Sequence, residues 1–445
     1  MRLTDALRIA PKYIVAFIGA GGKSSAIACL VGEISSEYPL VVTTTTKLHL
    51  DQSRLAEAHL VIQDDDALSR LPMMLEEHSS VLVTGEAIDG EPKWSGLDSA
   101  MMKELAIVAK REGATILVEA DGARGRSLKA PMGFEPAIPM DADLVVPVVG
   151  LDAIGEVLSE EWVHRPERVG FLLGLTIGEY LEPRHVAALL QDPAGGLKGV
   201  PEGADVRILF NKAETADRVN DGRAIAEELI GLPQVSAGIL ASVASEQPVS
   251  EVVGRVAGVV LAAGASERLG QPKQLISWQG RPLVWHAVQA ALGGGLSPVV
   301  VVLGAEAEKV RHVLNEEPVT FVKNPVWSAG LSGSLASGLA GVGDRVEAVV
   351  FLLSDTPFVN AALVRALVDK HRCTLSPLVA PMVGARRANP ILFDQMTFSA
   401  LHAVQGDRGG RELFQRFPHV SVEWDEKILF DVDSEEDLQR LKDFE

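Results

Sequence analysis

Short runs of β-branched and other apolar residues recur along this chain, and longer amphipathic stretches separate them. Such alternation is typical of βαβ units, in which helices connect the strands of a mostly parallel sheet. The series stops near the middle of the 445 residues and then begins again. The sequence therefore predicts an α/β protein with two sheets. The expected strands are 13–19, 41–46, 81–85, 115–120, 144–150 and 206–212 in the first series, and 258–264, 298–304, 348–355, 377–382 and 428–433 in the second.

A stretch of polar and small residues, ASVASEQPVSEVVGRV at 241–256, lies between the two series. Its composition is typical of a linker, although part of it could also form a helix. A chain of this length is expected to form two or three domains. We place the boundary near Ser250, which gives domains at 1–250 and 251–445.

The net charge of −19 limits the partners of this protein. A field of this sign repels nucleic acid and anionic membranes, so an anionic substrate must meet local cations or a metal ion. There is no run of 18 apolar residues and no signal-like start. Cys29 and Cys373, each expected to be a small buried residue, are too few for a disulfide framework. We expect a cytoplasmic protein without a membrane or nucleic-acid partner.

The strand at 256–261 runs directly into the loop AAGASERLGQPKQL at 262–275. Gly264 allows a sharp turn that presents backbone N–H groups to phosphate oxygens, and Arg268 and Lys273 add positive charge. The loop is not a Walker A motif, because it has no Gly-Lys-Ser/Thr triplet. A phosphate-binding loop is the functional interpretation, and a strand-to-helix turn with two surface cations is the alternative.

The pattern LAAGxSxRxGxxKxL in this loop resembles the signature of MobA-like NTP transferases, and most of all that of the molybdenum cofactor cytidylyltransferases, which are called MocA-like. The similarity continues over roughly the last 190 residues. It implies a Rossmann-like nucleotidyltransferase domain. The matching residues of the signature are Leu261, Ala262, Ala263, Gly264, Ser266, Arg268, Gly270, Lys273 and Leu275, and the further matching blocks are 324–335, 352–357, 388–393, 406–414 and 430–438.

Asp355 ends an apolar strand, at the edge where open α/β sheets bind ligands. The resemblance implies that Asp355 and Asp433 hold Mg²⁺, or Mn²⁺ in its place, with Asp431 as the less favoured second carboxylate. The alternatives are a turn role for Asp355 and a helix N-cap for Asp433. The resemblance also makes Arg268, Lys273 and Asp355 the expected catalytic residues. The expected nucleotide-binding residues are Leu261, Ala262, Ala263, Gly264, Asn324 and Ser334.

The Ala-Ala-Gly form of the loop resembles cytidylyl-transferring members more than guanylyl-transferring ones, so CTP is favoured over GTP as substrate. The implied acceptor is a molybdopterin-type pterin. Two departures from the family pattern leave the acceptor open, because Ser354 stands where Gly is usual and Ala388 where Gly precedes His-Pro or Asn-Pro. Another phosphorylated acceptor, or a carrier that only holds the finished cofactor, remains an alternative.

The first half of the chain has a phosphate-loop pattern of its own, GAGGKSS at 19–25, between a strand and a helical stretch. Lys followed by Ser is the ending of a Walker A loop, and glycines free the backbone to wrap a phosphate. The spacing is irregular, because Phe17 stands where the first Gly is expected. The predicted nucleotide-binding residues, for ATP or GTP, are Gly19, Gly21, Gly22, Lys23 and Ser24.

Polar groups follow three more strands of the first half. Glu119 and Asp121 end the strand at 115–120, as a Walker B acid does, and we expect Asp121 to bind the metal. The stretch 41–49 brings four threonines, Lys47 and His49, although satisfied hydroxyls in a buried strand are an alternative. The segment ILFNKAE at 208–214 is similar to the guanine-reading loop of GTPases, with Glu214 in place of Asp.

The blocks GAGGKSS, TTTTKLH and EADGARGRSLKAP resemble the YqeC family, whose members are described as accessory proteins of selenium-dependent molybdenum hydroxylases. The resemblance spans about residues 10–240 and implies a P-loop-like parallel-sheet domain, but no particular reaction. Together the two resemblances imply a two-module protein of molybdenum hydroxylase maturation, with a hydroxylase as client.

Overall fold

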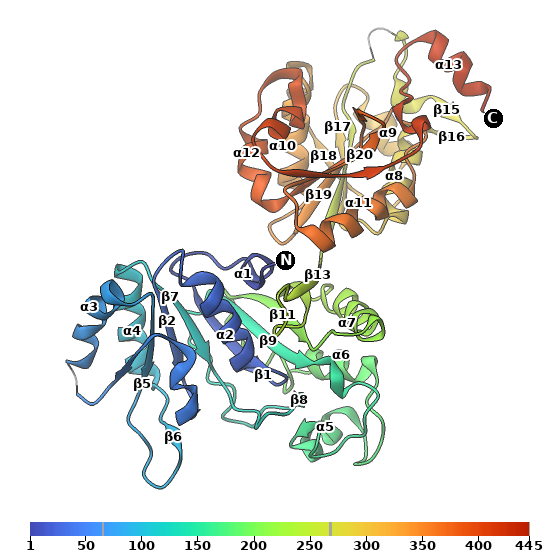
Figure 1. Cartoon of the computed structure of the whole chain (residues 1–445). Coiled ribbons are helices and arrows are strands. Elements are labelled where there is room, and N and C mark those ends of the chain that lie inside the picture. Colours follow the sequence, from blue (N-terminus) through green and yellow to red (C-terminus); the bar gives the residue numbers. More distant parts are fainter. Residues whose placement is uncertain (65, 267–268, 445) are drawn as a thin grey trace. The chain divides into compact units, whose positions relative to one another are not determined.

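The computed structural model describes residues 1–64, 66–266 and 269–444 and divides into two compact units, Met1–Val253 and Gly254–Glu445 (Figure 1). Both units are α/β and have mostly parallel sheets, as the alternating pattern predicts. Among the described helices, none is both long and apolar enough to cross a membrane.

The N-terminal unit is built on a nine-stranded sheet with the order β13-β12-β11-β9-β1-β7-β2-β5-β4. The central strand β1 pairs in parallel with β7 on one side and with β9 on the other. The strands of this sheet are β1 (Ile14–Gly19), β2 (Leu40–Thr44), β4 (Ala58–Val61), β5 (Ser80–Thr84), β7 (Thr115–Glu119), β9 (Leu144–Gly150), β11 (Asp205–Asn211), β12 (Val235–Ala241) and β13 (Val249–Gly254). Two small sheets pair β3 (Leu48–His49) with β6 (Lys93–Trp94) and β8 (Leu128–Lys129) with β10 (Val163–His164).

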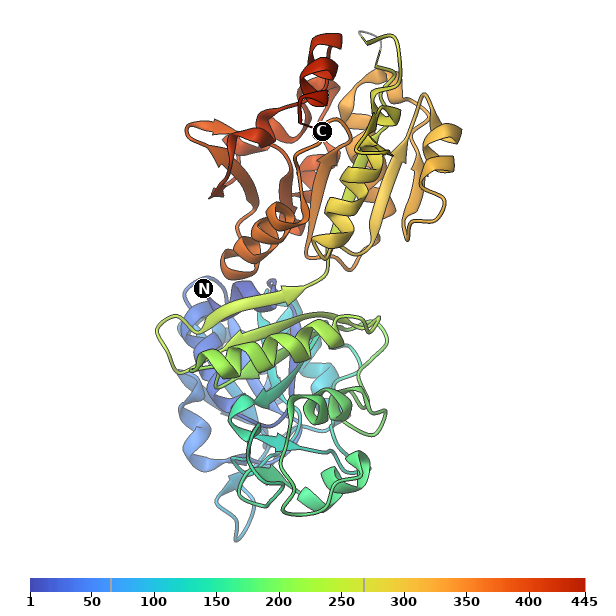
Figure 2. The same cartoon turned by 90° about the vertical axis from the view of Figure 1, so that its right-hand side faces the viewer.

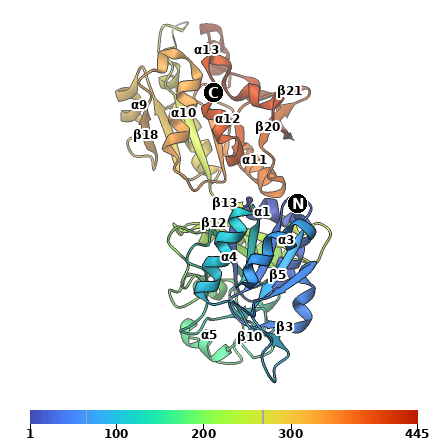
Figure 3. The same cartoon turned by 90° about the vertical axis from the view of Figure 1, so that its left-hand side faces the viewer.

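Helices cover the faces of this sheet, because the strands are apolar on both sides. Figure 3 shows α3 and α4, whose buried side chains share one core with alternate residues of β1, β5 and β7. A second core joins α5, α6 and α7 to β9, β11 and β12. The helices are α1 (Leu3–Leu7), α2 (Lys23–Ile34), α3 (Leu71–Glu77), α4 (Ser99–Arg111), α5 (Pro166–Leu173), α6 (Pro183–Gln191) and α7 (Ala216–Leu229).

The C-terminal unit has a mixed eight-stranded sheet with the order β18-β17-β14-β19-β22-β20-β21, and β23 pairs with β20. β14 lies between β17 and β19 and is parallel to both, whereas β22 is antiparallel to β19 and β20. The strands are β14 (Val256–Ala262), β17 (Val299–Leu303), β18 (Thr320–Lys323), β19 (Ala348–Leu353), β20 (Leu378–Val383), β21 (Arg386–Arg387), β22 (Ile391–Asp394) and β23 (His419–Glu423), and a further hairpin joins β15 (Ser277–Trp278) to β16 (Arg281–Pro282).

Alternation along β14 explains how this sheet is covered. Val260 packs into the core with α8, α9 and α11, whereas its neighbours Val259 and Leu261 pack into the core with α10 and α12. Successive side chains of a strand point to opposite faces, so each face receives its own helices. Figure 2 shows α8 (yellow) running along the strands. The helices are α8 (Leu283–Gly293), α9 (Ala307–Val313), α10 (Leu331–Gly341), α11 (Ala361–Thr374), α12 (Phe398–His402) and α13 (Glu435–Lys442).

Three sequence expectations about local structure were wrong. Residues 428–433 do not form a strand; the 3₁₀ turn Glu426–Leu429 occupies the first part, and the rest has no regular structure. The expected linker 241–256 contains β13, which borders the N-terminal sheet and buries Val252 and Val253. The cysteines are not buried, because Cys29 is half-buried and Cys373 is exposed.

Candidate functional site

The loop after β14 is held by hydrogen bonds between its own residues. The Gln274 amide, whose residue is 1% exposed, donates to the Gly264 carbonyl over 3.1 Å. The Lys273 backbone N–H donates to Ser266 Oγ over 3.0 Å, and Ser266 has a positive φ of 57°. Leu261, Ala262 and Ala263 are buried at the start of the loop, and Arg268 lies outside the described residues.

Lys273 brings the two predicted metal carboxylates together. Its Nζ pairs with Asp355 Oδ2 and lies 2.9 Å from Asp433 Oδ1. Burial by itself lowers the pKa of the Lys273 ammonium, but the charges of Asp355 and Asp433 and the hydrogen bonds to them outweigh burial and raise this pKa. Residues from three distant segments thus meet at the carboxyl ends of β14 and β19.

Backbone contacts explain how Asp433 reaches this place without a strand. The Val432 N–H donates to the Asp355 carbonyl over 3.0 Å, which fixes the segment before α13 beside the end of β19. Ser434 is the N-cap of α13 and accepts from the Asp437 N–H over 3.2 Å, so Asp433 is not the cap. Burial, with the charges of Asp433 and Asp355, raises the pKa of Asp431.

The geometry fits a divalent cation. Asp355 Oδ1 is buried without a hydrogen-bond partner in the described part of the chain, which leaves one carboxylate oxygen for another ligand. Among the side chains that the structure describes, no cluster of three or more His, Cys, Asp or Glu could bind a metal. Mg²⁺ commonly needs only one or two carboxylates when substrate phosphates complete its shell. Asp355 and Asp433 meet that requirement.

Asn324 and Ser334, predicted to bind nucleotide, are both buried and bond to each other. Asn324 Nδ2 donates to Ser334 Oγ over 3.0 Å, and Asn324 Oδ1 accepts from the Val326 N–H over 3.0 Å. These bonds fix the loop between β18 and α10. Contact between either residue and a nucleotide stays a prediction.

A cavity of about 790 Å³ opens next to this loop system. Leu261, at the end of β14, and Ile391 and Phe393, in β22, form part of its apolar wall, and Arg411 and Arg416 contribute positive charge. The blocks 388–393 and 406–414, which the sequence assigns to the acceptor side, both contribute to the wall. Sequence reasoning missed Arg416, which follows the second block and has no motif of its own.

In the N-terminal unit, the loop after β1 turns into α2 through three glycines with positive φ. Gly22 is the N-cap of α2 with φ 119°, and Lys23 and Ser24 begin the helix. A Cβ on Gly21 would lie 2.1 Å from the Gly150 nitrogen, so this position requires glycine for close approach. Lys23 is buried, and its Nζ donates to the Gly19 carbonyl over 2.5 Å.

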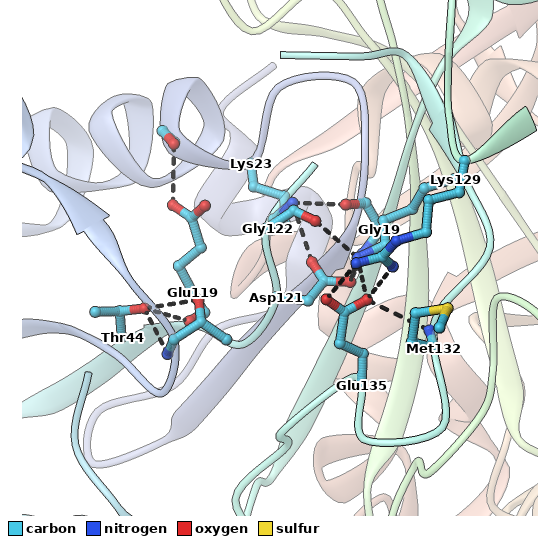
Figure 4. A network of polar contacts seen from close by, with 12 residues as sticks. Gly19, Lys23, Thr44, Glu119, Asp121, Gly122, Lys129, Met132 and Glu135 are labelled. Atoms are coloured by element: carbon cyan, nitrogen blue, oxygen red, sulfur yellow. Dashed lines mark hydrogen bonds and ion pairs between the residues drawn. The ribbon is translucent and has the colours of Figure 1, made fainter. Parts of the chain in front are cut away.

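Asp121 lies beneath the glycine loop, and metal binding by this residue stays a prediction. It is 1% exposed and lies between two buried lysines, 3.0 Å from Lys23 Nζ and 2.9 Å from Lys129 Nζ (Figure 4). Its Oδ2 also accepts from the Gly19 N–H over 3.0 Å. Two ammonium groups and a backbone donor thus hold this carboxylate beneath the loop, and its Oδ1, like that of Asp355, has no hydrogen-bond partner in the described part of the chain.

Glu119 instead contacts the first turn of α2. Its Oε2 accepts from Ser24 Oγ over 2.9 Å, and Gln52 Nε2 donates to the same hydroxyl over 2.7 Å. Burial raises the pKa of Glu119 against the opposing effect of Lys23. A P-loop Ser paired with a strand-end acid is the combination that holds Mg²⁺ in P-loop NTPases. Gln52 lies in a 3₁₀ turn with no motif, so sequence reasoning missed it.

The structure does not support the guanine-reading interpretation of residues 208–214, because Asn211 and Glu214 are used by contacts within the protein. Asn211 is buried, donates to the Gly21 carbonyl over 2.7 Å and accepts from the Val243 N–H over 3.1 Å. Glu214 pairs with Arg218 over 3.0 Å. Three threonines at the end of β2 likewise donate to backbone carbonyls, as the structural alternative expects: Thr43 to that of Val83 over 2.7 Å, Thr44 to that of Glu119 over 2.9 Å and Thr45 to that of Ala137 over 2.8 Å.

A cavity of about 540 Å³ opens over the glycine loop 19–25. Its lining is mostly cationic, whereas the whole protein carries a net negative charge. Glu119 is the one acidic residue among its described lining residues. Four of the lining cations are lysines that approach acids outside the lining, and two arginines add further positive charge. Such local positive charge attracts a polyanion such as a triphosphate. The cations that line the cavity are Lys23, Lys47, Lys93, Arg124, Arg126 and Lys212.

Glu135 gives the N-terminal unit a measurable pH dependence. Burial opposes its ionisation, but Arg165, at 2.7 Å and 3.1 Å, and Lys129 outweigh burial and lower the pKa of Glu135 to about 2. Because this pKa lies below its unfolded value, the stabilisation is complete above that value and is lost as pH falls toward about 2. We expect Glu135→Gln to lower the free energy of unfolding at pH 7 by about 3 kcal/mol.

Urea unfolding of the N-terminal unit at several pH values measures this effect. The difference between wild type and Glu135→Gln should shrink toward zero as the solution is acidified. Glu104→Gln, on the exposed side of α4, is the control and should leave the midpoint nearly unchanged. A constant difference at every pH would contradict the assignment.

Comparison with known proteins assigns each unit to a family. Residues 15–167 match the family described as YqeC protein, and residues 258–422 match the MobA-like NTP transferase domain. The chain is 37% identical over 198 residues to nicotine blue oxidoreductase of Paenarthrobacter nicotinovorans, covering 42% of this chain and 96% of that protein. It is 32% identical over 191 residues to the uncharacterized protein YqeC of Escherichia coli K12, covering 43% and 72%.

The chain is also similar to a guanylyltransferase over a shorter stretch and to a solved crystal structure. A probable molybdenum cofactor guanylyltransferase of Bacillus cytotoxicus is 30% identical over 146 residues, which cover 30% of this chain and 69% of that protein. The crystal structure of Rv0371c from Mycobacterium tuberculosis H37Rv aligns with a TM-score of 0.39 and 29% identity, over 42% of this chain and 96% of that one. The chain therefore belongs to the YqeC family through its N-terminal unit and to the MobA-like NTP transferases through its C-terminal unit, which makes it a nucleotidyltransferase.

Proposed function

We propose that the C-terminal unit is a molybdenum cofactor cytidylyltransferase, which transfers CMP from CTP to a molybdopterin-type acceptor and releases pyrophosphate. The meeting of Lys273 with Asp355 and Asp433 is the observation that supports this proposal most. The relative named as a probable molybdenum cofactor guanylyltransferase supports the same chemistry on the same class of acceptor.

In the proposed reaction an acceptor phosphate oxygen bonds to the α-phosphorus of CTP, and the bond from that phosphorus to the bridging oxygen breaks. Bringing anions together is the main barrier, so charge neutralisation and positioning matter most. Lys273, and Arg268 outside the described residues, would neutralise the triphosphate. A bound Mg²⁺ or Mn²⁺, held by Asp355 and Asp433, would supply further positive charge.

The 790 Å³ cavity is our proposed acceptor site. Its apolar wall suits a ring system, and Arg411 and Arg416 suit a phosphate. In this proposal Leu261, Ala262, Ala263 and Gly264 contact the nucleotide, and the bonded pair Asn324 and Ser334 holds the adjoining loop. A molybdenum hydroxylase is the proposed client for the product.

Pyrophosphate release by the full chain, with each of the four NTPs and molybdopterin as acceptor, tests this function. We expect kcat/KM for CTP to exceed that for GTP at least tenfold, about 1.4 kcal/mol of transition-state binding. GTP preference would replace the nucleotide but keep the reaction. Tight binding of dinucleotide cofactor without turnover would indicate a carrier. Redox turnover without pyrophosphate release would refute the transfer reaction, and the name of one relative, an oxidoreductase, suggests this outcome.

We also propose that ATP or GTP binds the N-terminal unit at Gly19, Gly21, Gly22, Lys23 and Ser24. The support is the six-cation cavity over the start of α2 and the bond between Ser24 and Glu119. Asp121 remains the proposed metal ligand of this unit, and Ser24 and Glu119, which bond to each other, would hold Mg²⁺ beside it. Ser24→Ala should weaken Mg·ATP or Mg·GTP binding about tenfold, as measured by equilibrium dialysis.

A further inference from the structure

A second cavity, of about 620 Å³, lies beside the nucleotide cavity of the N-terminal unit. Its size is that of a pocket for a small organic ligand. The residues that line both cavities are Lys47, Lys93, Gly122, Arg124 and Arg126. Four of these five carry a positive charge, so the wall between the two cavities is cationic.

Arg124 and Arg126 are the cations of this wall that protein groups leave unneutralised. Lys47 and Lys93 both approach Glu91, at 2.6 Å and 3.7 Å. By contrast, the guanidinium groups of Arg124 and Arg126 have no ion pair or hydrogen bond within residues 1–64 and 66–253. In a chain with a net charge of −19, two uncompensated arginines on one wall indicate an anionic ligand.

The loop that carries both arginines is tied to the nucleotide loop. The Gly21 N–H donates to the Arg126 carbonyl over 2.8 Å, and the Arg126 N–H donates to the Ala123 carbonyl over 3.1 Å. Arg124 has a positive φ of 51°, a conformation that costs roughly 1 kcal/mol in a non-glycine residue. The fold therefore holds these arginines in a strained turn against the glycine loop.

The far side of the second cavity has a different character. Phe134 lines it with a ring that is 78% exposed, and His164 contributes a second ring. Burial and the nearby cations, Arg165 first, lower the pKa of His164 to about 4, so this ring is uncharged at neutral pH. Arg165 is paired with Glu135 and is not part of the unneutralised charge. Glu160 and Glu167 also line this cavity, at exposed positions. The side with Arg124 and Arg126 thus suits a phosphate, and the side with Phe134 and His164 suits a planar group.

We propose that this second cavity binds a small molecule with an aromatic or planar ring and a phosphate group, next to the nucleotide in the N-terminal unit. Phosphate is favoured over carboxylate because two guanidinium groups together match the oxygens of a dianion. The proposal rests on the proposed nucleotide site for the identity of the neighbour, but it has its own residues and its own readout.

Phenyl phosphate is the probe, and benzoate is its carboxylate counterpart. Both are titrated calorimetrically into the full chain carrying Asp355→Asn, with and without saturating Mg·ATP. Phe134→Glu places a carboxylate in the second cavity at an exposed position, and Phe134→Gln is the uncharged control. Arg126→Gln changes the shared wall, and Ser24→Ala changes the nucleotide cavity only.

We expect phenyl phosphate to bind at least tenfold more tightly than benzoate. Phe134→Glu should weaken phenyl phosphate at least tenfold and Mg·ATP less than twofold. Phe134→Gln, which removes the ring without adding charge, should weaken phenyl phosphate less than Phe134→Glu does. Arg126→Gln should weaken both ligands. Equal binding of the two probes, or phenyl phosphate binding that Phe134→Glu does not change, would overturn the proposal. If Mg·ATP fails to bind while phenyl phosphate behaves as expected, the nucleotide proposal fails and this one stands.

Discussion

Replacing Asp355 with asparagine is expected to lower metal-dependent pyrophosphate release about a thousandfold, the usual effect of removing one strong electrostatic contact to a transition state. The variant keeps the shape of the side chain but loses the charge that Lys273 and a divalent cation would share. The fold should remain, because Lys273 keeps Asp433 as a partner. Initial rates with CTP, acceptor and Mg²⁺ measure the effect, and circular dichroism checks the fold.

Two further variants make this result specific. Asp369→Asn, at an exposed aspartate on α11, should keep the wild-type rate. Asp431→Asn distinguishes the two remaining carboxylates, because a loss equal to that of Asp433→Asn would make Asp431 a second ligand. A rate for Asp355→Asn within twofold of wild type would remove the metal from the proposed mechanism.

Gly21→Ala is expected to prevent stable folding of the N-terminal unit, a loss of about 4 kcal/mol or more. The new methyl group would lie 2.1 Å from the Gly150 nitrogen and 2.6 Å from its Cα, both backbone atoms of the central sheet. The position also has φ 94°, which an L side chain rarely adopts. Soluble yield and the urea midpoint of the N-terminal transition measure the loss.

Gly90→Ala is the matched control for this substitution. Gly90 also has a positive φ, of 76°, but a Cβ there would meet no atom within 4 Å. It should therefore show only the cost of the left-handed conformation, about 1 kcal/mol. Similar losses for both variants would mean that conformation, and not the close approach to Gly150, makes glycine necessary at Gly21.

The strands could be predicted because each buried strand is a continuous run of apolar residues, such as VVVVL at 299–303. Residues 428–433 show where this reasoning fails, since their apolar side chains are used by contacts to other elements and not by a sheet. Val432 is fully buried beside Trp278 and Leu283, and it bonds through its N–H to Asp355. A partner so distant in sequence leaves no periodic pattern.

In both candidate sites, residues that belong to a motif could be predicted and residues outside a motif could not. Lys273, Asp355 and Asp433 could be proposed from motifs and strand ends, and the fold brings them together. For Asp121 the sequence predicts a metal ligand but gives no sign of Lys129, which reaches Asp121 from a separate segment. Arg416 and Gln52 were missed because each reaches its site from a turn without a motif.

The bond from Val432 to the carbonyl of Asp355 also has a consequence for biosynthesis. Lys273 precedes Asp433 by 160 residues. During translation, the ribosome therefore completes the loop 262–275 and Asp355 before it reaches Asp433. In the proposed mechanism, the transferase unit lacks one of its two metal carboxylates until that final stretch docks. We therefore expect proteolytic removal of the stretch after Leu429 to abolish pyrophosphate release.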